Sequence, residues 1–457
     1  MNPTRQCSRR AFLVRATASA FAATTVPTLI PATALGRGGA PAPSQRVVLG
    51  AIGTGDRGQD VLRHFLQQAE CRVAAVCDVR RDMVEQARAL VDGRYQNRDC
   101  RAYADFRELL ARPDIDAVLI ASADHWHVPH ALAAVRAGKD LYVEKPLGLS
   151  LEEDQILRRE VLQRRRVFQF GTQQRSDRKF RLACELVRND CIGTLKHVNV
   201  WSPGSEPGGS TRQVPVPATL DYDFWLGPAA WRPYTENLVA VGWAKRWWFV
   251  SDFAVGFIAG WGIHPMDIAL WGAGDRASGK VEVEGTGTYP AEGICNTAAE
   301  WDVNFKFSTG LTLRFCGRPD GTKAPYPREQ EWRQRYGAIE THGTAFEGTD
   351  GWVHVDRSRL QVHPESLLDL DPEKFAVKLT RSSDQVKSFL AAVQSRQATV
   401  SSIESAVRAD AFCHVPDIAL RLKRKLTYDV KAETFPGDDA ANRRLRLRPM
   451  RPPWQVS

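Results

Sequence analysis

The sequence lacks the features that would place it in several well-defined protein classes. Its nine cysteines form no C-x-x-C pair, and it has no internal repeat and no low-complexity tract beyond the N-terminal leader. Scattered cysteines exclude the common zinc-finger and thioredoxin-like patterns, so the sequence predicts no metal site. The absence of repeats excludes solenoid architectures. Eight cysteines follow the predicted export signal, and we expect them to be free and mostly buried thiols.

A strong excess of charge is also missing. The formal net charge is +9, but residues 1–34 contain four arginines and no acid, which leaves +5 for the rest of the chain. This value is too small to predict a nucleic-acid partner. With 457 residues and 43% hydrophobic content, the chain is expected to form two soluble domains. A basic cluster near the C-terminus is expected to hold the tail against the body of the protein, and it comprises Arg443, Arg444, Arg446, Arg448 and Arg451.

The first 34 residues have the pattern of an export signal. Residues 8–13 match the twin-arginine motif around Arg9 and Arg10, an apolar stretch covers residues 16–30, and an A-x-A site ends at Ala34. We therefore predict a signal peptide over 1–34 and a flexible leader over 35–45. The many Ala and Thr residues in the apolar stretch argue against a stable membrane anchor. The signal predicts recognition by the twin-arginine export machinery, which carries folded proteins, and a periplasmic or otherwise exported location.

A glycine-rich turn joins the first strong apolar run to an amphipathic helix. The run at 47–52 reads as a buried parallel strand, and the helix places apolar residues at 61, 62, 65 and 66 on one face. Glycines at this position allow close approach of a pyrophosphate to the helix N-terminus. Asp78 closes the second strand, twenty residues after Gly58, and its carboxylate would accept hydrogen bonds from the ribose hydroxyls of NAD. The cofactor-binding residues predicted from this motif are Gly53, Thr54, Gly55, Asp56, Arg57, Gly58 and Asp78.

The choice between NAD and NADP depends on the residues around Asp78. Its carboxylate would repel a 2′-phosphate, whereas Arg80 and Arg81 are near enough to bind one. We predict NAD, with NADP as the alternative.

Alternating short strands and helices over 46–165 predict a Rossmann domain with a parallel sheet. A strand at 115–121 is followed by a loop over 122–127, and a strand at 140–143 is followed by Glu144, Lys145 and Pro146. Open α/β sheets bind ligands at the carboxyl ends of their strands. Further cofactor-site residues are therefore predicted at Ser122, His127, Glu144 and Lys145.

Longer strands with period-two alternation begin after residue 166, and they predict an α/β domain over 166–457 with a mostly antiparallel open sheet. These strands are expected at 196–201, 281–286, 300–307, 311–315 and 352–356. Helices at 385–393 and 403–422 are expected to return to the body of the protein. Seven of the thirteen tryptophans lie between residues 225 and 271. Most are predicted to be core residues, with a few, such as Trp261, contacting a sugar, and Trp126 is a further candidate.

The order of these motifs resembles the Gfo/Idh/MocA oxidoreductases, a family that includes glucose–fructose oxidoreductase and inositol dehydrogenase. The resemblance rests on the glycine turn, Asp78, the Asp124-His125-Trp126-His127 segment, the run 137–146 that ends in Glu-Lys-Pro, and residues 171–175. It covers nearly all of the mature chain, and its C-terminal half resembles the exported branch of the family. It implies a Rossmann domain, an open-sheet domain used in homo-oligomers, a bound NAD(P) and a small carbohydrate substrate.

The resemblance also implies residue roles. Lys145 is expected beside the nicotinamide, where it would polarise the reacting oxygen. The family element D-x-G-x-H aligns with residues 260–264, so that His264 becomes the expected proton acceptor and Gly260 stands where the aspartate is usual. Asp267, three residues after His264, is expected on the same helical face as a second catalytic group. Gln173, Arg175, Asp252, Trp126 and Trp261 are the predicted substrate-binding residues.

Three functions remain open at this level. The first is an exported oxidoreductase that moves a hydride between a sugar, polyol or glycoside hydroxyl and a tightly bound nicotinamide. The second is a glycoside hydrolase or lyase that uses bound NAD transiently. The third is a catalytically silent binding protein, in which glycine at position 260 has removed turnover.

Overall fold

The computed structural model describes residues 42–319 and 328–455. The predicted signal peptide and most of the predicted leader lie outside these residues. In the N-terminal unit of residues 1–46, the described part contains one short 3-10 helix, η2 (Pro43–Gln45). Within the described ranges, no helix combines the length and the apolar content that a membrane crossing requires.

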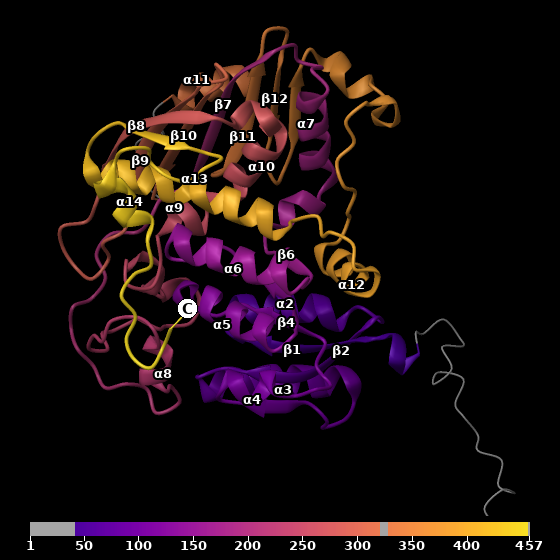
Figure 1. The fold of residues 1–457 in the computed structure, drawn as a ribbon, viewed down its shortest axis with the longest axis vertical. Helices are drawn as coiled ribbons and strands as arrows, with labels where there is room; N and C mark the ends of the chain where they lie inside the picture. The colour runs from indigo at the N-terminus through magenta and orange to yellow at the C-terminus, as the bar shows by residue number, and fades with distance from the viewer. Residues whose placement is uncertain (1–41, 320–327, 456–457) are drawn as a thin grey trace, which may run out of the picture. The chain divides into compact units, whose positions relative to one another are not determined.

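A parallel six-stranded sheet forms the first half of the larger unit (Figure 1). Its strand order is β3-β2-β1-β4-β5-β6, the order of a Rossmann fold. The strands are β1 (Val47–Ile52), β2 (Cys71–Cys77), β3 (Arg101–Tyr103), β4 (Ala117–Ile120), β5 (Asp140–Val143) and β6 (Phe168–Phe170). The connecting helices are α2 (Asp56–Leu66), α3 (Arg81–Tyr95), α4 (Phe106–Leu110), α5 (Asp124–Arg136) and α6 (Leu151–Gln163). The sheet continues past residue 165, where the sequence placed the domain boundary, because β6 pairs with β5.

The sequence pattern explains how this half folds. Strands β4 and β5 are buried along their whole length, as apolar strands covered on both faces must be. Helix α2 begins directly after Gly55 and buries the apolar face that its spacing predicted. The order reverses between β1 and β4, so a crevice opens at their carboxyl ends, which is where such sheets bind ligands.

Helix α5 begins earlier than the sequence predicted. We expected a loop over 122–127, but residues 124–127 form the first turn of α5, and they are buried. Pro129 lies inside this helix, where it has no N–H to donate. The helix loses that one hydrogen bond and continues. Its first turn is held instead by the rest of the protein, since the N–H of His125 donates to the carbonyl of Phe253 at 3.1 Å.

An eight-stranded sheet forms the second half, with the order β13-β12-β11-β7-β10-β9-β8-β14. Only the β7–β10 pair is parallel among the pairs of this sheet, which confirms the predicted mostly antiparallel sheet. Its strands are β7 (Leu195–Pro203), β8 (Lys280–Thr288), β9 (Glu300–Phe307), β10 (Thr312–Arg318), β11 (Gly343–Gly348), β12 (Trp352–Val355), β13 (Leu360–His363) and β14 (Leu426–Asp429).

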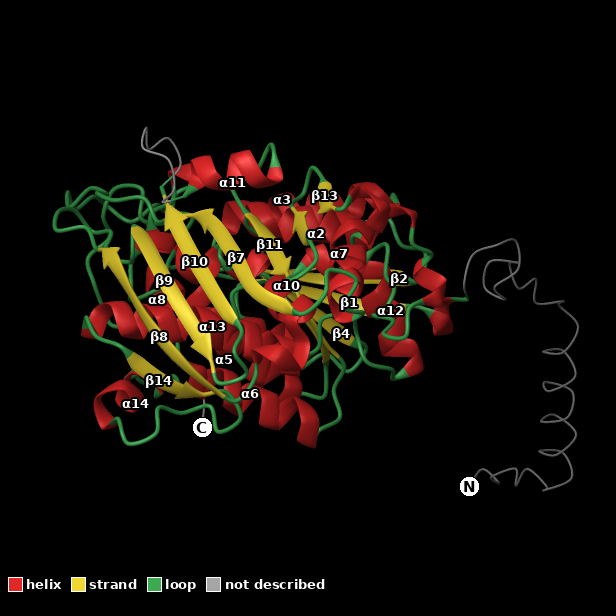
Figure 2. Ribbon diagram, turned by 90° about the horizontal axis from the view of Figure 1, so that it is seen from above, coloured by secondary structure: helices red, strands yellow, loops and turns green. Residues whose placement is uncertain are grey.

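Helices cover one face of this sheet, and strands β8, β9 and β10 lie open on the other (Figure 2). Helix α10 packs on β7 and β11, and α13 packs on β8. Residues 280, 282 and 284 of β8 point to the open face and are exposed. The helices of this half are α7 (Arg178–Arg188), α8 (Tyr222–Leu226), α9 (Phe257–Gly260), α10 (Ile263–Ala273), α11 (Glu329–Tyr336), α12 (Gln385–Ser395), α13 (Ile403–Leu422) and α14 (Asp439–Leu445).

The sequence predicted that late segments of the chain return to the body of the protein, and two of them reach the Rossmann half. Helix α12 buries Val386, Phe389 and Leu390 in the same core as β1, β2 and α2. The C-terminal tail is held by Arg451. Its guanidinium donates to the carbonyl of Gly227 at 3.1 Å and forms an ion pair with Asp223. Trp454 then packs against Trp126, with ring centroids 4.8 Å apart.

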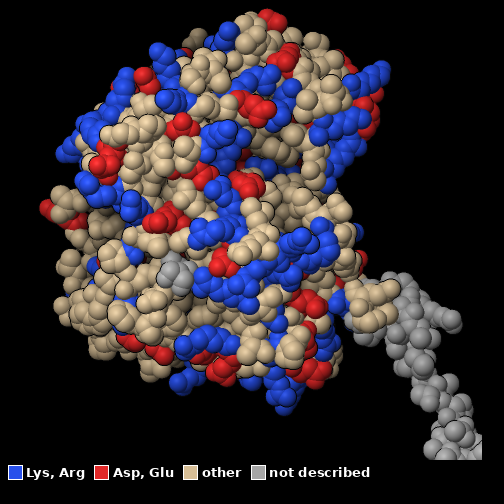
Figure 3. All heavy atoms as spheres, in the orientation of Figure 1, with Lys and Arg blue, Asp and Glu red and all other residues tan. Residues whose placement is uncertain are grey.

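The described cysteines and surface charges agree with the sequence analysis. All eight described cysteines are free thiols, and seven of them are buried. Figure 3 shows basic and acidic side chains interspersed over one face of the molecule, with basic ones gathered across its middle over α6. This helix and the residues that follow it contain Arg158, Arg159, Arg164, Arg165 and Arg166.

The place of α12 in the Rossmann core can be tested by truncating Phe389. Its ring is buried against Phe65 and Tyr142, with centroids 6.1 and 5.9 Å away. Phe389→Ala is expected to lower the free energy of unfolding by about 3–5 kcal/mol in urea titrations. Lys387→Ala, on the exposed side of the same helix, should change it by less than about 0.5 kcal/mol. Equal effects of the two substitutions would contradict this packing.

Candidate active site

The glycine turn after β1 fits a dinucleotide phosphate. Gly53 has φ of +82°, and a Cβ there would lie 2.4 Å from the backbone nitrogen of Ser122. A Cβ on Gly58 would lie 2.0 Å from the carbonyl oxygen of Gly53. At Gly55 nothing lies within 4 Å of the Cβ position, so open space faces the start of α2. The two tight positions fix the turn, and the open one leaves room for an anion at the helix N-terminus.

Asp78 holds this turn to the end of β2. Its Oδ2 accepts the backbone N–H of Thr54 at 2.6 Å, and its Oδ1 accepts the N–H of Arg80 at 2.9 Å. Burial raises the pKa of Asp78, and these hydrogen bonds oppose the rise. The guanidinium of Arg80 is engaged elsewhere, because its Nε donates to Asp82 at 3.1 Å and its Nη1 to the carbonyl of Val239 at 3.3 Å. The arrangement favours NAD, since Arg80 is turned to Asp82 rather than held ready for a 2′-phosphate.

A cavity lies over the turn and is lined by most of the predicted cofactor-binding residues. These are Gly53, Gly55, Asp56, Arg57, Asp78, Ser122, His127, Glu144 and Lys145. Thr54 and Gly58 do not line it; Thr54 instead donates to Asp78, and Gly58 packs on Gly53. Nine of the eleven predicted cofactor-binding residues therefore lie around one cavity.

The segment 239–248 of the second half closes the other side of the cavity, which the sequence did not predict. Asp56 accepts the backbone N–H of Gly242 at 2.7 Å, and the Lys245 ammonium lies 3.3 Å from the same oxygen. Trp247 and Trp248 line the cavity from this segment. The Lys245 ammonium also lies 4.1 Å from the centroid of the Trp248 ring. A nucleotide in this cavity would therefore be covered by the second half of the chain.

Lys145 connects the two halves at the edge of the Rossmann sheet. Its Nζ donates to the carbonyl oxygen of Gly260 at 2.7 Å. The preceding Glu144 is paired with Arg57, whose Nη2 lies 2.8 Å from Oε1. Burial lowers the pKa of Lys145 from its ordinary value, and Glu144 and Asp124 partly oppose this shift. The ammonium is thus held at the site by a backbone carbonyl rather than by a bonded carboxylate.

His127 holds together the ends of β4 and β5. Its Nδ1 lies 2.6 Å from the carbonyl oxygen of Pro146, and its Nε2 lies 3.0 Å from that of Ser122. Burial lowers the pKa of His127. The neutral imidazole can donate to one of the two carbonyls, so the residue positions the turn that presents Lys145.

A second cavity of about 300 Å³ continues from the first and is the size of a small-molecule site. Three predicted residues line this cavity and not the first: Gln173, Trp261 and His264. Three others, Asp56, Arg57 and Lys145, line both cavities. The Oε1 of Gln173 and the Nδ1 of His264 are buried and have no hydrogen-bond partner among the described residues. Buried polar atoms are normally paired, so these two atoms are available to hydroxyl groups of a bound molecule.

Two titratable groups in the second cavity have displaced pKa values. Burial and the nearby Lys145 charge lower the pKa of His264 well below its ordinary value, so its imidazole is neutral at pH 7. Burial raises the pKa of Asp124 to about 8, with Lys145 and Lys245 opposing the rise. Asp124 lines both cavities, and it is a site residue that the site predictions did not include.

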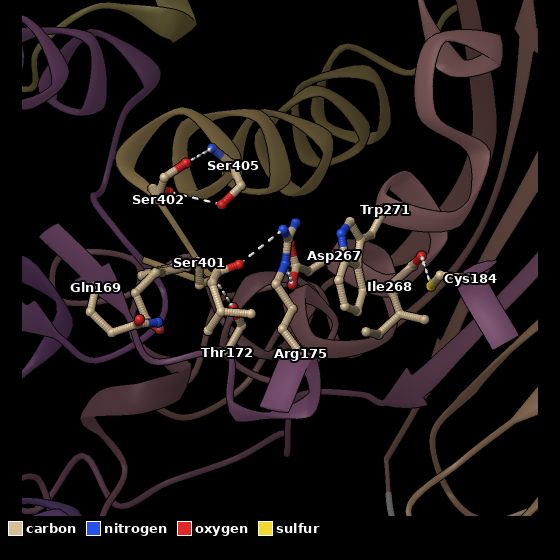
Figure 4. A network of polar contacts seen from close by, with 12 residues as sticks. Gln169, Thr172, Arg175, Cys184, Asp267, Ile268, Trp271, Ser401, Ser402 and Ser405 are labelled. Atoms are coloured by element: carbon tan, nitrogen blue, oxygen red, sulfur yellow. Dashed lines mark hydrogen bonds and ion pairs between the residues drawn. The ribbon is translucent and has the colours of Figure 1, made fainter. Parts of the chain in front are cut away.

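Four predicted site residues lie differently from expectation. Arg175 and Asp267 form a buried bidentate ion pair, with N–O distances of 2.7 and 2.6 Å, and neither lines either cavity (Figure 4). Asp267 therefore faces Arg175, although it shares α10 with His264. Asp252 pairs with Arg232 at 3.0 Å and is also away from both cavities.

Trp126, the fourth, lines the cofactor cavity and not the second one. Its indole N–H donates to the carbonyl of Trp225 at 2.9 Å, and its ring stacks on His130 with centroids 4.5 Å apart. It is therefore placed as a wall of the cofactor cavity.

A buried polar cluster lies behind the turn that follows β5. Asp154, Asp410 and His414 each place one ligand atom within 4.8 Å of the others. Asp410 accepts the backbone N–H groups of Leu147 and Gly148 at 3.4 and 3.3 Å. Burial and the neighbouring Asp410 raise the pKa of Asp154 well above its ordinary value, which favours its protonated form. The cluster supports the turn from behind, and cysteine spacing could not have revealed it.

Taken together, the sheet order, the glycine turn and the enclosed cavity define a Rossmann-type dinucleotide-binding protein with an attached substrate domain. Residues 47–172 match the Gfo/Idh/MocA model described as an oxidoreductase family with an NAD-binding Rossmann fold. Residues 201–330 and 352–456 match the C-terminal alpha/beta domain of the same family. The chain belongs to the Gfo/Idh/MocA family of NAD-binding oxidoreductases.

Curated relatives match over part of the chain. A glycosyl hydrolase family 109 protein of Saccharopolyspora erythraea is 38% identical over 112 residues, which cover 24% of each chain. An inositol 2-dehydrogenase of Pseudomonas savastanoi pv. phaseolicola is 35% identical over 147 residues, 32% of this chain and 42% of that one. The chain thus spans less than half the length of these relatives.

Solved structures share the fold across both halves. A putative myo-inositol dehydrogenase of Sinorhizobium meliloti covers 83% of this chain and 99% of its own, with a TM-score of 0.54 and 18% identity. GenD2 from gentamicin A biosynthesis, solved in complex with NAD, covers 84% and 97%, with a TM-score of 0.59 and 17% identity. At these identities the likeness shows the fold alone.

Two glycine substitutions separate turn geometry from cofactor contact. Gly58→Ala is expected to lower both the melting temperature and the affinity for NAD, because its Cβ would collide with the Gly53 carbonyl. Gly55→Ala should leave the melting temperature nearly unchanged but should still lower the affinity for NAD, because its Cβ enters the open space over α2. Calorimetric titration with NAD and thermal unfolding measure the two effects. Unchanged affinity in Gly55→Ala would contradict phosphate binding at this turn.

The role of Asp267 can be distinguished by a double substitution. Asp267→Ala leaves the Arg175 guanidinium buried without its partner, and we expect a loss of about 3–5 kcal/mol in the free energy of unfolding. The pair Arg175→Met with Asp267→Leu should recover most of this loss. Full stability in Asp267→Ala with lost turnover would instead support the catalytic role that the sequence suggested.

Proposed function

We propose that this protein is an exported NAD-dependent oxidoreductase that acts on a hydroxyl group of a sugar, polyol or glycoside. The observation that carries the proposal is the meeting of the two cavities at Lys145. The ammonium lines both of them, while His264 and the unpartnered Gln173 amide oxygen lie in the second. A hydroxyl-bearing molecule there would reach a proton acceptor and a cation beside the nucleotide site.

The residues present can divide the chemistry between them. When bound, NAD supplies the hydride acceptor. His264 is the proposed proton acceptor, because its neutral form predominates at pH 7. Lys145 is proposed to stabilise negative charge that develops on the reacting oxygen. Gln173 and Trp261 would orient the sugar ring, the first by hydrogen bonding and the second through its apolar face.

The printed names of relatives support this class of reaction and one alternative. Inositol 2-dehydrogenases favour oxidation of a ring hydroxyl, and the family 109 relative favours a glycosidase with transient use of NAD. Release of an aglycone without accumulation of NADH would favour the alternative. A protein that retains nucleotide but shows neither activity would be the silent binding protein.

Location and assembly are part of the proposal. The twin-arginine pattern of residues 8–13 supports export to the periplasm or beyond. The open face of the eight-stranded sheet supports a homo-oligomer formed through β8, β9 and β10. Because segment 239–248 covers the cofactor cavity, we propose that the nucleotide remains bound between turnovers. Fractionation of the host cell tests the export, and light scattering of the purified protein tests the homo-oligomer.

The first test of function is to denature the purified exported protein and identify released nucleotide by mass spectrometry. Near-stoichiometric NAD(H) is expected, whereas release of NADP(H) would show that the cofactor is NADP rather than NAD. An empty protein that also fails to bind added nucleotide would exclude both NAD-dependent activities. Absorbance at the NADH band during incubation with inositols and aldoses then measures oxidation.

His264→Asn is expected to reduce kcat by at least about 100-fold while NAD remains bound. His363→Asn, on the exposed edge strand β13, should have no effect. In the wild type, the base is lost only as pH falls through the lowered pKa of His264. The acid-side decline of kcat/KM should therefore lie below about pH 6.5, the ordinary histidine value. A decline centred above that pH would exclude His264 as the base.

A further inference from the structure

Arg357 is a cation at the rim of the second cavity without an acidic partner. It lies in the turn between β12 and β13 and lines the cavity together with Lys145 and His264. Its guanidinium carbon is 5.2 Å from the centroid of the Trp261 ring. Among the described residues, no carboxylate forms an ion pair with it. Burial lowers the pKa of Arg357, and the charge of Arg57 lowers it further.

Two other cations of the cavity lining, Arg57 and Lys245, are already matched by acids. Arg57 pairs with Glu144 at 2.8 Å, and Lys245 pairs with Asp56 at 3.3 Å. A second acid of the lining, Asp60, is paired with Arg63 at 3.0 Å. Burial raises the pKa of the remaining acid, Asp124, which favours its uncharged form. Positive charge therefore remains at Arg357 and Lys145.

The adjacent acid does not neutralise Arg357 either. Asp356 is fully buried, and its Oδ1 accepts the backbone N–H groups of Ser358 and Arg359, each at 2.8 Å. Its Oδ2 accepts the N–H of Glu340 at 3.2 Å. Asp356 thus fixes the turn, and the turn directs the next side chain, Arg357, to the cavity.

The nucleotide is not placed to supply the missing anion. Arg357 lines the second cavity and the groove beside it, but it does not line the cavity over the glycine turn. The phosphates belong at that turn, next to Gly55 and the start of α2. The anion that would pair with Arg357 must therefore belong to the molecule in the second cavity.

We propose that the substrate is an acidic sugar whose carboxylate is bound by Arg357, with Trp261 beneath the guanidinium. This inference rests on the proposed oxidation in the same cavity and names the class of substrate. The planar guanidinium matches a carboxylate with two parallel hydrogen bonds. Stacking on an indole leaves the edge of the guanidinium free to make them. Gly260 adds no opposing charge, since it offers only the carbonyl that accepts from Lys145.

The test compares D-glucuronate with D-glucose, its neutral counterpart, on the NAD-loaded protein. Binding is followed by tryptophan fluorescence and oxidation by NADH absorbance. The wild type is expected to bind glucuronate at least about tenfold more tightly than glucose. Arg357→Gln should remove this preference, with the change in KM rather than in kcat. The control Arg359→Gln keeps the backbone N–H that Asp356 binds and should keep the preference.

A second variant tests the same charge without removing Arg357. A Cβ on Gly260 would meet only Phe257 Cδ1, at 3.5 Å, so Gly260→Asp can be accommodated. Its carboxylate would enter the cavity near Lys145 and weaken glucuronate binding, whereas glucose binding should not weaken. Equal affinity of the wild type for both sugars, or a preference that survives in Arg357→Gln, would overturn the inference.

Two further outcomes keep this inference separate from the proposed function. Glucuronate that binds through Arg357 but is never oxidised would overturn the oxidation and support the acidic-sugar site. Oxidation of glucose with no effect of either variant would support the oxidation and overturn the acidic-sugar site. A preference for a sulfated sugar over glucuronate would overturn the carboxylate assignment.

Discussion

The hydrogen bond from Lys145 to the carbonyl of Gly260 is the contact on which the active-site architecture depends. Lys145 stands at the end of a Rossmann strand, and Gly260 ends the short helix α9 of the second half. The bond therefore fixes the edge of the parallel sheet against the helix pair that carries His264. The bond thereby sets the position of the Lys145 ammonium relative to the element that carries the His264 imidazole. His127 and Asp410 form hydrogen bonds to the turn that follows Lys145 and so help to fix the position of this lysine.

Much of this arrangement follows from local sequence. The strand, glycine turn, helix and acid at the end of β2 are encoded within about thirty consecutive residues, and such short-range patterns predict the cofactor cavity directly. Helix α13 and strand β9 agree with their predicted ranges, and β9 shows the period-two burial on which its prediction rested. Helix α5 was placed too late because its first turn is held by a long-range contact, from the N–H of His125 to the carbonyl of Phe253, which local sequence does not show.

The site residues that the sequence did not predict are those placed by long-range contacts. No local pattern indicates that Arg357 reaches the cavity, since it occupies an ordinary turn in the second half of the chain, far in sequence from the glycine motif. Asp267 looked catalytic because helical spacing puts it near His264, yet spacing cannot show that Arg175 arrives from η3 (Gln173–Ser176) to pair with it. The segment 239–248 was noticed for its tryptophans, but its closure over the cofactor depends on hydrogen bonds to Asp56.

The return of α12 to the Rossmann core has a consequence for how the protein is made. The glycine turn is synthesised early, but the sheet face behind it is covered by Val386, Phe389 and Leu390, more than three hundred residues later. A ribosome-bound nascent chain would therefore hold an incompletely covered nucleotide domain for most of its synthesis. The core of that domain can be completed only when nearly the whole chain has been made. Stable binding of the cofactor is therefore expected only after the protein leaves the ribosome.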